Sequence, residues 1–205
     1  KILYTNTPVM GTPTDPGVPQ GVLAYDLASG QSALLQAQGE RELLVDAQWS
    51  PDGKMISFRD YCFECVGQFF TLDLATGARF AWSEEDGDRW VGLDTDWSPD
   101  GSRVAFDQWD FYNPPEATYG LWVGGAGGQD LRLVHTAQGQ SIAFPRWSPD
   151  GSRIAFSQVL TTVEENAYQR RADLVVVAPD GTGARTLVQG SKMIYPPDWS
   201  PDGKL

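Results

Sequence analysis

The sequence has little of the side-chain chemistry on which most catalytic sites depend. Its 205 residues include a single histidine, His135, and only two cysteines. A Ser-His-Asp triad could use His135, but the G-x-S-x-G motif that presents a nucleophilic serine is missing, since residues 139–143 depart from it at the last position. We therefore interpret His135 as a polar loop residue and predict a protein that is not an enzyme, with no catalytic residue, metal site or cofactor.

Motifs for phosphate binding and for paired catalytic carboxylates are also lacking. The glycines between residues 124 and 128 fall where a hairpin turn is expected and do not open a helix. The adjacent carboxylates Glu84-Glu85 and Glu164-Glu165 are predicted to be solvated charge in loops. Neither feature indicates a nucleotide site or an acid–base pair.

Positive charge is scarce as well. Lys and Arg total 15 against 27 Asp and Glu, which gives a net charge of −12 and a pI near 4.3. Nucleic acids and anionic membranes select basic patches, so this balance argues against both as partners. No apolar run approaches the ~18 residues of a membrane span, and we expect no membrane insertion. A signal peptide is not present, but a mature chain would have lost one.

The two cysteines, Cys62 and Cys65, form an isolated C-x-x-C pattern. A local disulfide that braces a loop would fit an extracytoplasmic protein. A redox dithiol would want a helix N-terminus, which is not predicted here, and a zinc site would need a second pair of ligands. Two free thiols are the remaining alternative. We favour the disulfide, which would loosen its loop on reduction without unfolding the domain.

The most informative feature that is present is a repeat. The phrase Trp-Ser-Pro-Asp-Gly begins at Trp49, Trp97, Trp147 and Trp199, at spacings of 48, 50 and 52 residues. A constant period near fifty residues is typical of repeat architectures. Proline presets φ at the first central turn position, aspartate suits the second, and glycine adopts the left-handed conformation that returns the chain as a strand. Each phrase therefore predicts a hairpin turn between two antiparallel strands.

The segments around each turn predict four strands per repeat, which we call a, b, c and d. Strand a carries the Trp, and strand b follows the turn as a short β-prone run such as Arg103–Phe106. A second hairpin supplies strands c and d. A four-stranded unit of this size cannot bury both faces alone, whereas radial stacking of such units does so. The fold class is therefore all-β: a single β-propeller domain over residues 1–205, with four-stranded antiparallel blades and four repeats of about fifty residues.

The extended phrase Trp-Ser-Pro-Asp-Gly-(Lys/Ser)-x-(Ile/Val)-(Ala/Ser)-Phe resembles the repeat of TolB-type, WD-repeat-like propellers. It is also similar to the repeats in the propeller domains of prolyl-oligopeptidase and tricorn-type peptidases. The resemblance covers the whole chain. It implies the fold strongly and function weakly, because one fold hosts many tasks. In that family the phrase is structural, so Trp49, Trp97, Trp147 and Trp199 are expected to be core residues.

The repeat phase suggests how a ring could close. Residues 1–5 align with strand b, and the sequence ends where another strand b would begin. A strand a at residues 196–199 could therefore complete the first blade and remove its open edge. Two alternatives remain: the chain is an excerpt of a six- to eight-bladed propeller, or two chains form a homodimer that completes a larger ring.

The residues that precede each Trp are Gln48, Asp96, Arg146 and Asp198. We expect them at the innermost strand or the seam between blades, where Arg146 would lie between Asp96 and Asp198. We interpret this set as an ion-pair cluster rather than as a binding site.

Unequal loops give the best indication of function. The a–b and c–d turns are short, whereas the b–c loops are long and differ from one another: residues 6–21, 60–67, 108–118 and 158–171. The b–c loops and the d–a connections emerge on one face, and variable loops on a rigid scaffold commonly bind partners. We call this the long-loop face. Its aromatic and basic residues predict a partner-binding surface: Tyr61, Trp90, Trp109, Phe111, Tyr112, Tyr168, Arg170 and Arg171.

The leading hypothesis is a non-catalytic scaffold that binds a protein or peptide through this face. The TolB resemblance implies a periplasmic or extracellular location. The alternative is the substrate-gating propeller of a serine peptidase whose catalytic domain lies elsewhere. A propeller-type glycan lyase normally needs several metal ligands or a strong base, and a single histidine argues against it.

Overall fold

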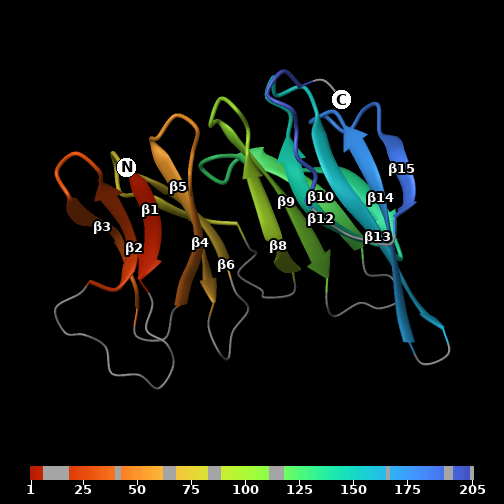
Figure 1. The fold of residues 1–205 in the computed structure, drawn as a ribbon, viewed down its shortest axis with the longest axis horizontal. Coiled ribbons are helices and arrows are strands. Elements are labelled where there is room, and N and C mark those ends of the chain that lie inside the picture. The colour runs from red at the N-terminus through yellow and green to blue at the C-terminus, as the bar shows by residue number, and fades with distance from the viewer. Residues whose placement is uncertain are drawn as a thin grey trace. The chain divides into compact units, whose positions relative to one another are not determined.

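The computed structural model describes residues 1–6, 19–39, 43–61, 68–82, 89–110, 118–164, 167–191 and 196–203. The chain folds into two compact units, Lys1–Ser83 (unit 1) and Glu84–Leu205 (unit 2). The described residues of each unit form two antiparallel sheets (Figure 1). These residues contain no helix, and therefore no helix that could cross a membrane. The fold class is confirmed: the chain is all-β and built of propeller blades.

Unit 1 contains the first and second blades. The first blade has three strands in the order β1-β2-β3: β1 (Ile2–Asn6), β2 (Gly21–Asp26) and β3 (Gln31–Ala37). The second has four in the order β4-β5-β6-β7: β4 (Leu43–Trp49), β5 (Met55–Tyr61), β6 (Gln68–Asp73) and β7 (Arg79–Ala81). The sequence order of strands is kept in each sheet, as a meander requires.

Unit 2 contains the third and fourth blades, which have four strands each. The third consists of β8 (Arg89–Trp97), β9 (Arg103–Asp110), β10 (Thr118–Gly125) and β11 (Arg132–Gln138). The fourth consists of β12 (Ser141–Trp147), β13 (Ile154–Glu164), β14 (Ala167–Val177) and β15 (Arg185–Ser191). In each complete blade these four strands are a, b, c and d of the predicted repeat.

The repeated phrase forms the predicted turn, and its serine has a part that the sequence reasoning missed. In the third blade the Gly101 N–H donates to the Ser98 carbonyl at 2.8 Å, with Gly101 at φ 70°. The Ser98 hydroxyl donates to Asp100 Oδ1 at 2.6 Å and accepts the Arg103 N–H at 2.9 Å. The same bonds recur at Ser50 and Ser148. The serine therefore joins the turn aspartate to the start of strand b.

These hydrogen bonds stabilise the ionised form of the turn aspartates. The pKa of Asp52, Asp100 and Asp150 is lowered to about 2. The hydrogen bond from the serine hydroxyl is the largest cause, and a hydrogen bond from a backbone N–H is the second. Because the folded pKa lies below the unfolded one, the stabilisation is present above pH 4 and is lost as pH falls towards 2. We expect the triple variant D52N/D100N/D150N to lose part of the acid sensitivity of wild type between pH 4 and 2, as measured by urea unfolding. If the free energy of unfolding of the two proteins fell equally between pH 4 and 2, the turn aspartates would not be the cause of the acid sensitivity.

Each unit has its own apolar core, built from inward-facing strand residues. In unit 1 the core joins Val22 of the first blade to five residues of the second: Leu44, Ile56, Phe58, Phe70 and Leu72. In unit 2 a continuous cluster runs from Leu121 and Val134 of the third blade to Ile154, Phe156 and Val177 of the fourth. Trp97 and Trp147 are 6% and 5% exposed, whereas Trp49 and Trp199 are half-buried. The cores therefore lie between paired blades, as the repeat predicts.

The seam between the third and fourth blades contains a hydrogen bond where an ion-pair cluster was expected. Asp96 Oδ2 accepts the backbone N–H of Trp147 at 2.6 Å. The Arg146 guanidinium donates to the Pro145 carbonyl at 2.7 Å, and the Trp199 indole N–H donates to the Arg146 carbonyl at 3.0 Å. Burial raises the pKa of Asp96 to about 6, opposed by the Trp147 N–H and by the positive charge of Arg146. In these three contacts Asp96, Arg146 and Trp199 therefore each bond to a backbone group.

The last described segment departs from the prediction. Residues 196–200 have no regular secondary structure, whereas a strand was expected at 196–199. The repeated phrase in this segment predicts a turn that ends at Gly203. That turn is nevertheless formed, with the Gly203 N–H donating to the Ser200 carbonyl at 2.8 Å. Closure of a ring through this segment stays a prediction.

Candidate binding site

The longest hairpin of unit 2 extends beyond its sheet. β13 and β14 pair along eleven residues, from Ile154↔Val177 to Glu164↔Ala167. β12 pairs with β13 only as far as Val159, and β15 pairs with β14 only as far as Ala172. Residues 160–164 and 167–171 therefore form a two-stranded ribbon that has no neighbouring strand among the described residues, and we call it the arm. In Figure 1, β13 and β14 run on past the other strands.

The arm corrects the prediction of a b–c loop over residues 158–171. Most of that segment is strand, and only residues 165 and 166 lie outside the described hairpin. The reason is local, because Thr161, Thr162 and Val163 are β-branched and favour extended backbone. A two-stranded ribbon alone is marginally stable in water, so the arm depends on the rest of its sheet for support.

A cavity of about 570 Å³ lies beside the arm, where the third and fourth blades of unit 2 meet. Asp94 of β8 and Asp107 of β9 contribute carboxylates, residues 141–144 at the start of β12 contribute one side, and Thr161 and Arg170 of the arm contribute another. In these two blades, strand b ends on the side of the sheet where the cavity lies, and strands a and c begin on that side. The cavity, which we call the unit-2 pocket, therefore opens on the long-loop face.

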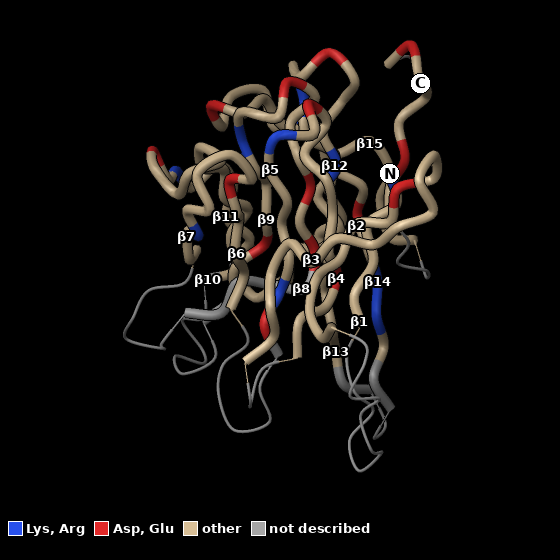
Figure 2. Tube along the Cα trace, turned by 90° about the vertical axis from the view of Figure 1, so that its left-hand side faces the viewer, with Lys and Arg blue, Asp and Glu red and all other residues tan. Residues whose placement is uncertain are grey.

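The pocket has a buried floor and an exposed rim. Ile142, Val159 and Asp107 are 3%, 5% and 8% exposed, whereas Thr161 and Arg170 are exposed. Thr161 and Arg170 are paired across the arm, so their side chains lie on the same face of the ribbon. The blue segment of β14 in Figure 2 marks the basic residues of this strand. A ligand group that enters the pocket would thus pass the Arg170 guanidinium at the rim and then meet the carboxylates of Asp94 and Asp107 inside.

A β-bulge shapes one side of the pocket. The register of β12 and β13 shifts between Ala143 and Arg146, and Phe144 has φ 58°. A positive φ is unusual for a bulky side chain and is maintained only by the surrounding structure. Bulges redirect side chains at sheet edges and next to functional sites. Here the bulge includes the half-buried ring of Phe144, which lines the pocket.

The residues that the sequence assigned to partner binding are only partly brought together. Trp90 and Trp109 were expected in loops but lie in β8 and β9, where they are register partners. Tyr168 belongs to the arm, opposite Val163, and Tyr61 is the last residue of β5 in unit 1. Arg170 lines the unit-2 pocket and Arg171 is exposed on the arm. Phe111, Tyr112, Cys62 and Cys65 lie outside the described residues.

His135 was expected in a loop and lies instead in β11. Its Nε2 is 3.1 Å from Gln158 Oε1, and its ring lies 5.1 Å from that of Phe156. The Gln158 amide group donates in turn to Gln140 Oε1 at 2.8 Å. His135 is half-buried, so this network gives it a structural role between β11 and β13. Among the described residues, no group of three or more His, Cys, Asp or Glu could hold a metal ion.

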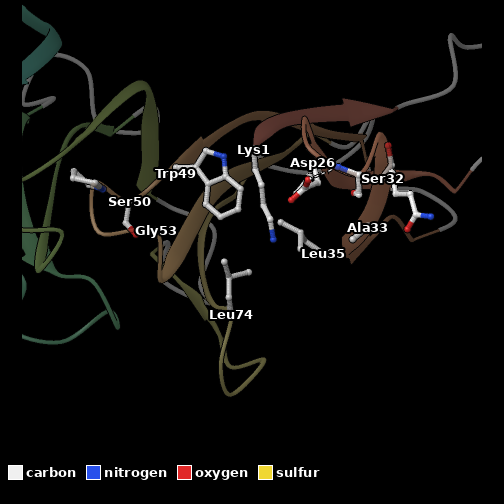
Figure 3. A pocket seen from close by; sticks show the side chains of 13 residues that line it. Lys1, Asp26, Ser32, Ala33, Leu35, Trp49, Ser50, Gly53 and Leu74 are labelled. Carbon is white, nitrogen blue, oxygen red and sulfur yellow. Dashed lines mark hydrogen bonds between the residues drawn. The ribbon is translucent and has the colours of Figure 1, made fainter.

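A second cavity, of about 750 Å³, lies in unit 1 between the first two blades, on the side of the short turns. Figure 3 shows the Lys1 side chain beside Trp49, with Leu35 and Leu74 near it and Asp26 on the opposite side. Unit 2 repeats this arrangement, because Arg103, at the position equivalent to Lys1, lies 4.9 Å from the ring of Trp147. A basic side chain thus lies beside the Trp of the next blade in both units, although Met55 stands at this position in the second blade, and we interpret this cavity as scaffold.

Comparisons with known proteins show the fold. No family model and no curated relative matches the sequence. Among solved structures, the putative TolB from Agrobacterium tumefaciens superposes with a TM-score of 0.58 at 18% identity, over 89% of this chain and 66% of that one. An oligogalacturonate lyase in complex with manganese has a TM-score of 0.60 at 19% identity, over 89% of this chain and 51% of that one. A prolyl endopeptidase has a TM-score of 0.60 at 16% identity, over 83% of this chain and 26% of that one.

These likenesses confirm the resemblance to TolB-like and peptidase propellers. The chain spans less than two thirds of the length of each of these three proteins. The similar structures include a putative TolB and also enzymes, so the shared fold does not decide between binding and catalysis. Function has to be argued from the site.

Proposed function

We propose that this chain is a non-catalytic β-propeller module that binds a protein or peptide partner through its long-loop face. The observation that carries the proposal is the unit-2 pocket beside the arm, since a preformed cavity of about 570 Å³ has the size of a ligand site. The mechanism is the presentation of a rigid platform without bond chemistry. The resemblance to TolB supports a periplasmic or extracellular location.

The chemistry of the pocket fits binding better than catalysis. Its described lining has two carboxylates, hydroxyl groups, aromatic rings and one arginine, but no histidine, cysteine or lysine. Buried apolar residues at the floor and polar residues at the rim are the arrangement of a recognition site. The Arg170 guanidinium at the rim can donate to a carboxylate or carbonyl of the partner, as expected for a charged anchor.

The arm gives a direct test. Joining Leu160 to Arg171 through Asn-Gly, a favoured two-residue hairpin turn, removes Thr161 and Arg170 from the pocket while β12–β15 stay paired. We expect wild type to select peptides from a displayed random library and the shortened protein to bind them at least tenfold more weakly. The double variant S152A/T182A, at the short turns of the opposite side, should bind like wild type. Equal binding by the shortened protein would refute this site.

The same peptides test the absence of catalysis. After prolonged incubation with purified protein, mass spectrometry should recover every selected peptide intact. Hydrolysis at an enzymatic rate would overturn the non-catalytic proposal. A substrate-gating role is the competing hypothesis, and it would be favoured by an α/β-hydrolase segment with a nucleophile elbow elsewhere in the gene.

A further inference from the structure

We propose that the peptide partner binds as an added β-strand along the edge of β13 in the arm, with an acidic side chain next to Arg170. This inference rests on the proposed function and names the binding mode and the chemistry of the peptide. In strand addition, main-chain hydrogen bonds supply the affinity and the side chains around the edge supply the specificity. The register of the fourth blade, the sequence of the edge and the position of Arg170 support it.

The register of the fourth blade leaves one edge of the arm without a partner strand among the described residues. β12 pairs with β13 only as far as Ser141↔Val159, whereas β13 continues to Glu164, opposite Ala167 of β14. Successive residues of an antiparallel strand direct their N–H and C=O groups alternately to the two sides. Residues 160–164 therefore use alternate groups for β14 and present the others along the line of β12. Such a row of main-chain donors and acceptors is a template for a further strand.

The sequence of this edge favours pairing. Natural edge strands are commonly protected by charged side chains, proline or bulges. Residues 160–163 are Leu-Thr-Thr-Val, without charge or proline, and their register with β14 has no shift. The β14 edge of the arm carries instead the exposed residues Arg170 and Arg171. The β13 edge is therefore the one suited to receive a strand, and its β-branched residues keep the backbone extended.

Arg170 gives the added strand a charge preference. It lies opposite Thr161, so both side chains are on the face of the arm that lines the unit-2 pocket. Arg170 is exposed and, within the described part of the chain, forms no ion pair. A residue added opposite Thr161 would lie about 10 Å from Arg170, two strand spacings away. Only the short threonine lies between them, so a glutamate carboxylate at this place can accept charge-assisted hydrogen bonds from the guanidinium.

The start of β12 fixes the position of the acidic residue in the peptide. An added strand antiparallel to β13 runs in the direction of β12, so its C-terminal end approaches Ser141. Because Ser141 is already paired with Val159, the added strand has to leave the ladder opposite Leu160. The side chain of Leu160 is 39% exposed and suits an apolar neighbour there. The expected ligand is therefore an extended segment in which a glutamate is followed by one apolar, β-branched residue at the end of the paired stretch.

Fluorescein-labelled heptapeptides provide the probe: Ser-Thr-Val-Thr-Val-X-Val-amide, with X as Glu, Gln or Lys. Fluorescence anisotropy would measure their affinity for the purified protein. We expect the Glu peptide to bind at least tenfold more tightly than the Gln peptide, and the Lys peptide to bind more weakly than both, because Arg170 attracts a carboxylate and repels an ammonium group. The preference for Glu should weaken as salt is raised.

N-methylation of the Glu peptide tests the strand itself. One isomer carries N-methyl groups at positions 3 and 5 of the peptide, and the other carries them at positions 4 and 6. In an added strand one of these pairs points at β13 and the other points away. One isomer should therefore bind like the parent and the other at least tenfold more weakly. In ¹⁵N-labelled protein, binding should also slow hydrogen exchange at every second amide of residues 160–164.

Variants of the protein test the charge preference. R170Q keeps a hydrogen-bonding group without the charge, so it should bind the Glu and Gln peptides equally. R185Q is the matched control, because Arg185 is an exposed arginine of the same blade, on β15, and this variant should keep the full preference for Glu. The protein with the shortened arm lacks the edge and should bind both peptides at least tenfold more weakly.

The outcomes separate this inference from the proposed function. If both N-methylated isomers bound like the parent, or neither bound, strand addition would be wrong, whereas loss of binding by the shortened protein would still support the long-loop site. A preference for Glu that persisted in R170Q would overturn the part assigned to Arg170. If no peptide bound to wild type, the inference would be wrong, and the displayed library would then decide the proposed function by itself.

Discussion

Trp97→Ala is expected to lower the free energy of unfolding of unit 2 by about 3–5 kcal/mol, the usual cost of truncating a large buried side chain. Trp97 is 6% exposed at the end of β8, where it precedes the turn that leads into β9. Its removal would leave a cavity at a seam that β8 and β9 share with β12. Urea unfolding followed by circular dichroism would measure the loss, independently of the indole fluorescence that the substitution removes.

Trp199→Ala is the matched control for this prediction. Trp199 occupies the same position of the repeated phrase but is half-buried, and its indole N–H donates to the Arg146 carbonyl. We expect a smaller loss of about 1 kcal/mol, typical of one hydrogen bond with partial burial. A Trp97→Ala protein that melts within a degree or two of wild type would contradict the core position of Trp97.

The predictability of this molecule follows from how local each interaction is. The repeated phrase contains nearly all the groups that form its turn, because the glycine, aspartate and serine lie within five residues of one another. The turn, the strand that follows it and the period could therefore be predicted from the sequence. The c–d hairpins were predicted for the same reason, including the glycine-rich turn that follows β10.

The candidate site was harder to predict because its parts are distant along the chain. Arg170 was named from its loop, but Asp94 and Asp107 were not, since neither belongs to a motif. The arm was missed because residues 158–171 were assigned by the long spacing between strands, although the β-branched run at 161–163 indicated a strand.

The residue before each Trp illustrates a further limit. A list of charges suggested ion pairs among Asp96, Arg146 and Asp198, yet Asp96 accepts a backbone N–H from the neighbouring blade. Side-chain identity along a strand does not reveal which backbone groups of an edge strand such as β12 face the neighbouring blade. Polar residues at seams can therefore be placed from sequence, but their partners cannot.

Asp96 should make the stability of unit 2 fall as pH rises from 4 to 7. Burial raises its pKa to about 6, above the 3.8 of an unperturbed aspartate. Because the folded state binds the proton more tightly than the unfolded state, the contribution of this group is fully present below pH 4 and is lost as pH passes 6. A shift of this size corresponds to roughly 3 kcal/mol. The pH range in which Asp96 changes stability lies above the range of the turn aspartates, so the contributions of the two kinds of aspartate can be measured separately.

Two substitutions divide the charge of Asp96 from its hydrogen bond. D96N keeps an oxygen that can accept the Trp147 N–H and removes the charge, so it should be more stable than wild type at pH 7 and equal to it near pH 4. D96A removes the acceptor and should be less stable than D96N at every pH by about 1–3 kcal/mol, the cost of an unsatisfied buried donor. Urea unfolding at pH 4, 5, 6 and 7 would measure both, with the exposed turn variant D100N as the control. If wild type and D96N kept a constant difference from pH 4 to 7, Asp96 would not titrate in this range and the charge would have no part in the stability of the seam.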